Sequence, residues 1–125
     1  MLTKEEDVLH VHDHQWAAIS NSDELFWHDF PWPVRKPPKD PEDLTSTRIV
    51  AYVLSQYYPG GESKSSKDRI KEHIKEWHPD RFETKYLPKV VQEDREKVQE
   101  GARVVVRVLN EMLTLSGPLN IGEQP

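Results

Sequence analysis

The stretch KEWHPDRF, residues 75–82, lies where one helical pattern ends and before the next begins. Proline has no amide hydrogen and restricts its predecessor, so Pro79 ends the first helix and disfavours helical geometry at His78. A helix-stopping turn, with an aspartate bonded to backbone N–H groups, accounts for these residues without any partner. It does not account for Phe82, because a solvated loop favours a polar residue. We expect Phe82 and Tyr86 to fold back onto the neighbouring helices.

The residues before this turn predict a helix over 64–77. Ser65 and Asp68 form an S-x-x-D start, in which a side-chain oxygen satisfies an exposed N–H group. Apolar residues then recur at spacings of four and three and give one narrow stripe: Ile70, Ile74 and Trp77.

The residues after the turn predict a second helix, from Pro88 or Lys89 to Leu113. Its apolar residues form the kind of seam that antiparallel helices bury: Val91, Val98, Ala102, Val105, Leu109 and Met112. Gly101 interrupts this helix at a cost of about 1 kcal/mol relative to alanine, which a close helix crossing would explain. The two helices are therefore predicted to form an antiparallel hairpin, joined by the loop HPDRFETKYLP and carrying the triplet at its tip.

Two more helices are predicted upstream. The run TSTRIVAYVLSQYY, residues 45–58, has hydroxyl residues for an N-cap and ends at the stop signal Pro-Gly-Gly. We expect it to lie across the hairpin. Residues 3–19 form another candidate helix, with a capping box between Thr3 and Glu6.

Residues 20–44 are rich in proline and carry four large aromatics around the motif Pro-Trp-Pro. We expect an extended arm that packs Trp27, Phe30 and Trp32 onto a helical surface; the alternative is a disordered linker. The predicted organisation is an N-terminal helix and arm (1–44), a helical domain (45–116) and a flexible tail (117–125). The fold class is all-α, with no competing strand pattern.

The composition narrows the classes of function. A chain of 125 residues with 31% charged residues and a net charge of −5 is a poor general ligand for nucleic acid. The absence of cysteine excludes disulfides and Cys-based zinc sites. No apolar run reaches the roughly 20 residues that span a bilayer. We expect a monomer in the cytoplasm or nucleus, with no membrane association.

The residues of catalysis and metal binding are sparse. His10 and His14 share a helical face, with His12 between them, and imidazoles bind Zn, Cu or Ni. Too few ligands accompany them, so we expect exposed histidines and no metal. His78 and Asp80 could act as an acid–base pair, but no nucleophile motif, phosphate loop or carboxylate pair accompanies them. We therefore expect no enzymatic activity and no cofactor.

Charged residues form two stripes on the helix before the turn. Lys67, Lys71 and Lys75 recur every four residues, and Asp68, Glu72 and Glu76 do the same beside them. With Lys64 and Arg69 the helix sums to 5 − 3 = +2 in an acidic chain. Such a stripe steers an acidic partner surface. The alternative is a solvated face whose charge pairs contribute about 0.3–0.5 kcal/mol each.

A helix ending in an aromatic residue, then His-Pro-Asp and a basic residue, then a long helix, resembles the J-domain of co-chaperones. More closely, WHPDRF, RVLNEML and the upstream FWHDFPWPV resemble the C-terminal J-like region of NF-kappa-B inhibitor-like proteins and related fungal proteins. There the matching pieces are Trp16, Pro31-Trp32-Pro33, residues 77–82 and Asn110.

The J-domain resemblance implies docking on a chaperone of heat-shock protein 70 type and stimulation of its ATPase. The implied contact residues are Lys67, Lys71, Lys75, His78, Pro79, Asp80 and Arg81. Glu72 departs from the pattern, because that position is often basic in J-domains. A second hypothesis therefore stays open: a degenerate J-like scaffold that binds another protein without activating a chaperone.

Overall fold

The structure, a computed structural model, describes residues 4–55 and 65–121, and its regular secondary structure is helical, as predicted. No strand occurs among these residues, although Leu25 and Val90 form an isolated bridge. The longer helices are α1 (Lys4–Ser20), α2 (Ser46–Val53), α3 (Ser66–Trp77) and α5 (Gln92–Ile121). Short helical turns complete the fold: η1 (Trp27–Asp29), η2 (Pro41–Asp43), α4 (Pro79–Arg81), η3 (Phe82–Tyr86) and η4 (Leu87–Lys89).

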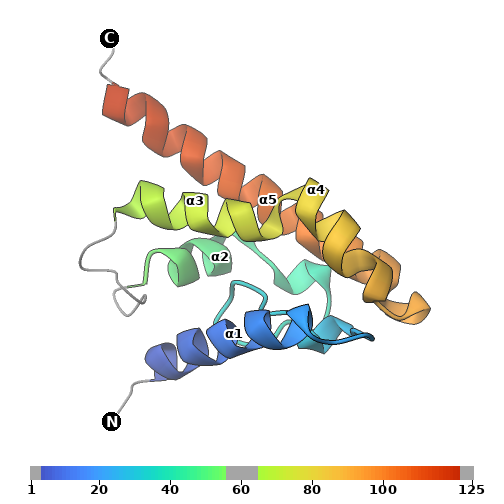
Figure 1. Cartoon of the computed structure of the whole chain (residues 1–125). Helices are drawn as coiled ribbons and strands as arrows, with labels where there is room; N and C mark the ends of the chain where they lie inside the picture. Colours follow the sequence, from blue (N-terminus) through green and yellow to red (C-terminus); the bar gives the residue numbers. More distant parts are fainter. Residues whose placement is uncertain (1–3, 56–64, 122–125) are drawn as a thin grey trace.

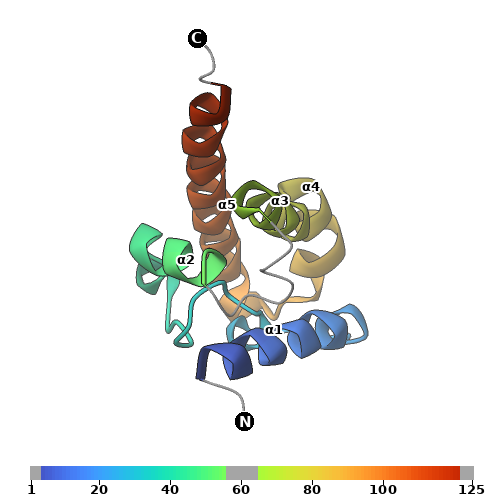
Figure 2. The ribbon, with the colours of Figure 1, turned by 90° about the vertical axis from the view of Figure 1, so that its left-hand side faces the viewer.

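The predicted antiparallel pair consists of α3 and α5, which run side by side in opposite directions, with α2 against both (Figures 1 and 2). The predicted cap is present, since the Asp68 N–H donates to Ser65 Oγ at 3.1 Å. Ile70 and Trp77 are buried and Ile74 partly so. The α5 seam is buried from Val98 onward, while Val91 is half-exposed.

Helix α2 starts as predicted but ends early. The Thr45 hydroxyl accepts from the Arg48 N–H at 3.2 Å, so a hydroxyl N-cap is confirmed. The helix ends at Val53 rather than at residue 58, and Leu54 is exposed. A contact that the sequence does not reveal accounts for this, because Arg69 Nη1 donates to the carbonyls of Val53 and Ser55 at 3.4 and 2.9 Å. The predicted stop at residues 59–61 lies outside the described residues.

The connection between α3 and α5 is not a loop. After His78, α4, η3 and η4 continue as almost unbroken helical turns to Lys89. Pro79 is tolerated because it occupies the first position of α4, where no intrahelical N–H bond is needed. The His-Pro-Asp triplet therefore lies at a kink beside the middle of α5, and not at the far tip of the hairpin.

Helix α5 also differs from its predicted bounds. It begins at Gln92, since the Val90 and Val91 N–H groups bond Leu87 and Leu25 instead. It extends to Ile121 and not to Leu113. Nothing in the structure explains why Gly117 and Pro118, both weak helix formers, keep a helical backbone.

The proline-aromatic arm packs as predicted, and the disordered linker is excluded. Trp27, Phe30 and Trp32 are 6%, 2% and 2% exposed and belong to the same core as α3 and α5. Both buried indole N–H groups are satisfied: Trp27 Nε1 donates to the Pro38 carbonyl at 2.6 Å and Trp32 Nε1 to the Trp27 carbonyl at 3.0 Å.

Gly101 leaves the space in which this arm packs against α5. A Cβ at position 101 would lie 2.8 Å from Trp32 Cη2 and 2.9 Å from Trp27 Cζ3. The two indoles stack on each other, with ring centroids 4.3 Å apart. The glycine is therefore explained by two tryptophans of the arm, and the predicted helix crossing is not its cause.

Helix α1 is present as predicted and crosses the bottom of the molecule in Figure 1. Ile19 is buried and Trp16 is partly buried against the core. The predicted capping box falls outside what is described, because it requires Thr3.

Candidate protein-docking site

The HPD turn, His78, Pro79 and Asp80, is exposed at all three residues. His78 has φ −55° and ψ 132°, which turns the chain out of α3 and into α4. Its Nδ1 accepts the Asp80 N–H at 3.2 Å, so the histidine caps the turn that follows it. An accepting nitrogen is unprotonated, so Nε2 of the neutral ring carries the hydrogen and can donate to a partner.

The three predicted lysines lie along one edge of α3, the lysine edge: Lys67, Lys71 and Lys75. Each step of four residues advances only about 40° around a helix, so the side chains remain in line. Lys71 and Lys75 are exposed and Lys67 is half-buried. This edge leads into the HPD turn.

The predicted acidic stripe is only partly solvated. Asp68 is exposed, but Glu72 and Glu76 are half-buried, about 100° around α3 from the lysines that precede them. Burial, and then the charges of Asp13 and Glu72, raise the pKa of Glu76 to about 7. Glu76 is therefore close enough to Asp13 of α1 and to Glu72 for their charges to act on it, whereas Lys71 and Lys75 are exposed to solvent.

Arg81 is exposed but belongs to the acidic side. Its charge opposes the rise in the pKa of Glu76, which places the guanidinium near that carboxyl group. The structure thus places six of the seven predicted contact residues along one edge and its turn, while Arg81, the next residue, interacts electrostatically with Glu76.

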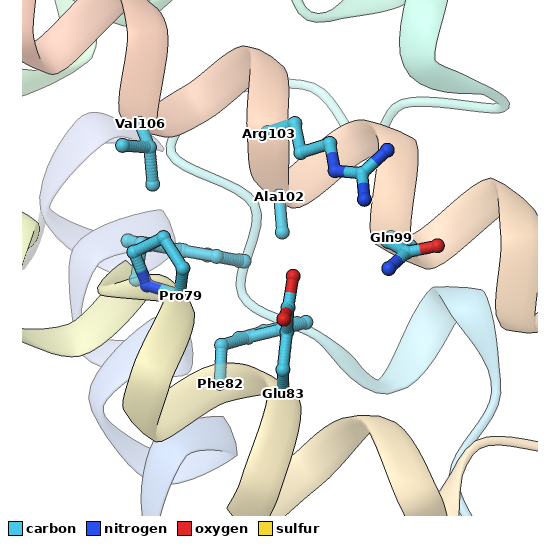
Figure 3. A pocket seen from close by; sticks show the side chains of 8 residues that line it. Pro79, Phe82, Glu83, Gln99, Ala102, Arg103 and Val106 are labelled. Atoms are coloured by element: carbon cyan, nitrogen blue, oxygen red, sulfur yellow. The ribbon is translucent and has the colours of Figure 1, made fainter.

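A small hollow of about 20 Å³ lies between the HPD turn and α5. Figure 3 shows Pro79 facing Ala102 and Val106 across it. Its other lining residues are Trp77, Phe82, Glu83, Gln99 and Arg103. Arg103 and Val106 were not predicted to line the site; the signal in the sequence is their position one and four residues after Ala102, at the border of the buried seam.

A cluster of polar side chains that was not predicted from the sequence lies where α1 meets α2 and α3. His12 Nδ1 and the Tyr52 hydroxyl are joined by a hydrogen bond of 2.7 Å. The Tyr52 ring meets the buried His73 edge-on, with centroids 5.8 Å apart. Burial, and then the charge of His73, lower the pKa of His12 to about 4. The sequence signal that could have indicated this cluster is the position of His73 on the apolar stripe of α3.

The histidines of α1 accordingly do not behave alike. His14 is exposed, as expected, whereas His12 is half-buried against Tyr52. The side chain of His10 lies outside the described residues. Among the side chains that the structure describes, those of residues 11–55 and 65–115, no group of three histidine or carboxylate side chains has the arrangement of a metal site.

Comparison with known proteins gives one result. The family model described as NF-kappa-B inhibitor-like protein 1 C-terminal domain matches residues 47–117. The match runs from α2 into α5 and contains the HPD turn. No curated protein and no solved structure matches the chain significantly. In the part of the chain that the structure describes, no helix is both long and apolar enough to cross a bilayer.

Proposed function

This chain belongs to the NF-kappa-B inhibitor-like protein 1 C-terminal domain family, and from that premise we propose that it is a co-chaperone. Its HPD turn docks on a chaperone of heat-shock protein 70 type and stimulates ATP hydrolysis by that chaperone. The protein itself does no chemistry. It acts by binding one conformation of the partner better than the other and so shifting the partner's populations.

The exposed, capped His-Pro-Asp triplet is the observation that carries this proposal. Four consecutive exposed residues, the triplet and Arg81, lie between two buried aromatic residues, Trp77 and Phe82, each 1% exposed. A turn needed only to reverse the chain requires neither the histidine cap nor such support. A preorganised turn loses less conformational freedom when it docks, which favours binding.

The lysine edge supplies the charge of the docking surface. Lys71 and Lys75 are exposed, whereas Glu72 and Glu76 beside them are half-buried, so the lysines present more of their charge to the solvent than the glutamates do. Exposed charges of one sign mainly accelerate association with an acidic partner and make it dependent on salt.

The second hypothesis, a J-like scaffold that binds another protein without activating a chaperone, has one specific observation in its favour. The charge of Arg81 opposes the rise in the pKa of Glu76, so Arg81 interacts with a carboxyl group of its own molecule. In that case the turn is still a contact surface, but no ATPase responds to it.

Single-turnover ATP hydrolysis by a chaperone of heat-shock protein 70 type, with and without this protein, tests the proposal. We expect stimulation by the wild-type chain and its loss in His78→Gln. The matched control is His14→Gln, because His14 is an exposed histidine on α1. No stimulation by the folded wild-type chain would exclude the co-chaperone and leave the scaffold.

A charge reversal tests the lysine edge separately. Lys71→Glu should slow association and weaken its salt dependence, whereas Lys39→Glu, at an exposed lysine of the arm, should change neither. Equal effects of the two variants would show that overall charge, and not the lysine edge, steers the partner.

A further inference from the structure

Three buried aromatic rings, at residues adjoining the HPD turn in the sequence, pack against one another beneath the turn. Trp77, directly before His78, stacks on Phe82 with centroids 5.3 Å apart and an interplanar angle of 24°. Phe82 meets Tyr86 edge-on at 5.8 Å. All three are at most 2% exposed. The positions of these rings therefore set the conformation in which the turn is presented.

These three rings rest in turn on the proline-aromatic arm. Trp32 stacks on Trp77 with centroids 5.0 Å apart and planes 21° apart. Phe30 lies 5.3 Å from Phe82 and meets Tyr86 edge-on at 6.5 Å. The arm thus contacts the residue before the turn and the residues after it.

Helix α1 adds a contact that joins the two sides of the turn. Trp16 meets Trp77 edge-on at 5.1 Å and lies 5.9 Å from Tyr86. One side chain therefore touches a residue preceding the triplet and a residue following it. If either residue moved relative to the other, Trp16 would lose one of these contacts.

We infer that Trp16, Phe30 and Trp32 are positioning residues for docking, which hold the HPD turn in its binding conformation. The inference rests on the proposed function. It assigns part of the docking site to residues outside the segment that the family model matches, 47–117. That segment contains the turn and its own three rings but none of the supporting rings.

The size of the effect follows from populations. A partner that binds only the ordered turn has an apparent affinity reduced by the fraction of molecules in that state. If loss of Trp16 leaves the turn ordered in about a tenth of the molecules, affinity falls about tenfold.

The experiment compares Trp16→Ala with Ile19→Ala. Ile19 lies on the same helix and is 2% exposed, but it offers no ring to Trp77 or Tyr86. The first measurement is amide hydrogen exchange at Phe82, whose N–H donates to the His78 carbonyl at 2.8 Å. Exchange at Asp68, at the other end of α3, reports whether the whole domain has loosened. The second measurement is stimulation of the chaperone's ATPase.

We expect Trp16→Ala to accelerate exchange at Phe82 about tenfold more than at Asp68, and to weaken stimulation by a similar factor. Ile19→Ala should change both amides equally, and Trp16→Phe should restore most of the stimulation. Equal changes at the two amides in Trp16→Ala, or full stimulation by that variant, would overturn the inference. If the wild-type chain itself gives no stimulation, the proposed function fails first, and the docking role of these rings fails with it.

Discussion

Replacing Gly101 by alanine tests whether the arm dictates the residue in α5. In an ordinary helix interior, alanine is favoured over glycine by about 1 kcal/mol. Here the new methyl group would lie 2.8 Å from Trp32 Cη2 and 2.9 Å from Trp27 Cζ3. Both indoles are buried and hydrogen-bonded through Nε1, so neither can move without a loss elsewhere.

Overpacking a well-packed core by a methyl group costs about 1–3 kcal/mol. Subtracting the gain of about 1 kcal/mol in helix propensity leaves Gly101→Ala destabilising by up to about 2 kcal/mol. For a chain of this size the melting temperature should fall by up to about 8 °C.

Thermal and urea unfolding, followed by far-ultraviolet circular dichroism, measure the difference. Glu100 is the control, because it is exposed in the same helix: there, alanine should be more stable than glycine by about 1 kcal/mol. Gly101→Ala should be less destabilising in a Trp32→Leu background, since the vacated space accepts the methyl group. A double-mutant cycle measures this difference. A stabilising Gly101→Ala in the wild-type background would refute the assignment of Gly101 to the arm.

Three further changes have defined outcomes. Asp94→Ala removes the acceptor of the Trp27 N–H, 2.9 Å away, and should lower the free energy of unfolding in urea by about 1–2 kcal/mol, with Asp94→Asn recovering part of it. Protonated Glu76 stabilises the fold fully below its ordinary pKa of 4.5, and this contribution is lost as the pH rises through about 7. The melting temperature of Glu76→Gln should therefore exceed that of the wild type by an amount that grows as the pH rises over that interval. A difference in melting temperature that does not change with pH would contradict the burial of Glu76. Deleting residues 1–44 should lower the melting temperature and increase binding of a hydrophobic dye; unchanged values would mean that the arm does not cover the core.

The sequence predicted the helices whose signals are local. A hydroxyl N-cap for α2, the cap at Ser65 and the spacing of Ile70 and Trp77 are properties of a few consecutive residues, and each was confirmed. Burial of the arm was also predictable, because a cluster of aromatic side chains has few ways to avoid water other than packing on a surface.

Predictions failed where a distant group decided the outcome. Arg69 donates hydrogen bonds to the carbonyls of Val53 and Ser55 at the end of α2, so that helix is shorter than its apolar pattern predicts. The segment after His78 becomes helical although its proline reads as a stop, because Phe82 and Tyr86 bury their rings against the arm. The exposure of the HPD turn followed from the sequence, but the separation of Arg81 from the lysine edge did not.

By itself the sequence determined an all-α chain, its main helices, the exposed triplet between two of them and a line of lysines leading to it. Only the tertiary structure decided what lies beneath the triplet and beside it: the rings of α1 and the arm, the glycine that leaves room for two indoles, and the burial of Glu76 within reach of the charge of Asp13 on α1. The physical reason is range. Caps and periodicity act within one or two turns of helix, whereas packing and the pKa of a buried carboxyl group depend on residues that are distant in the chain.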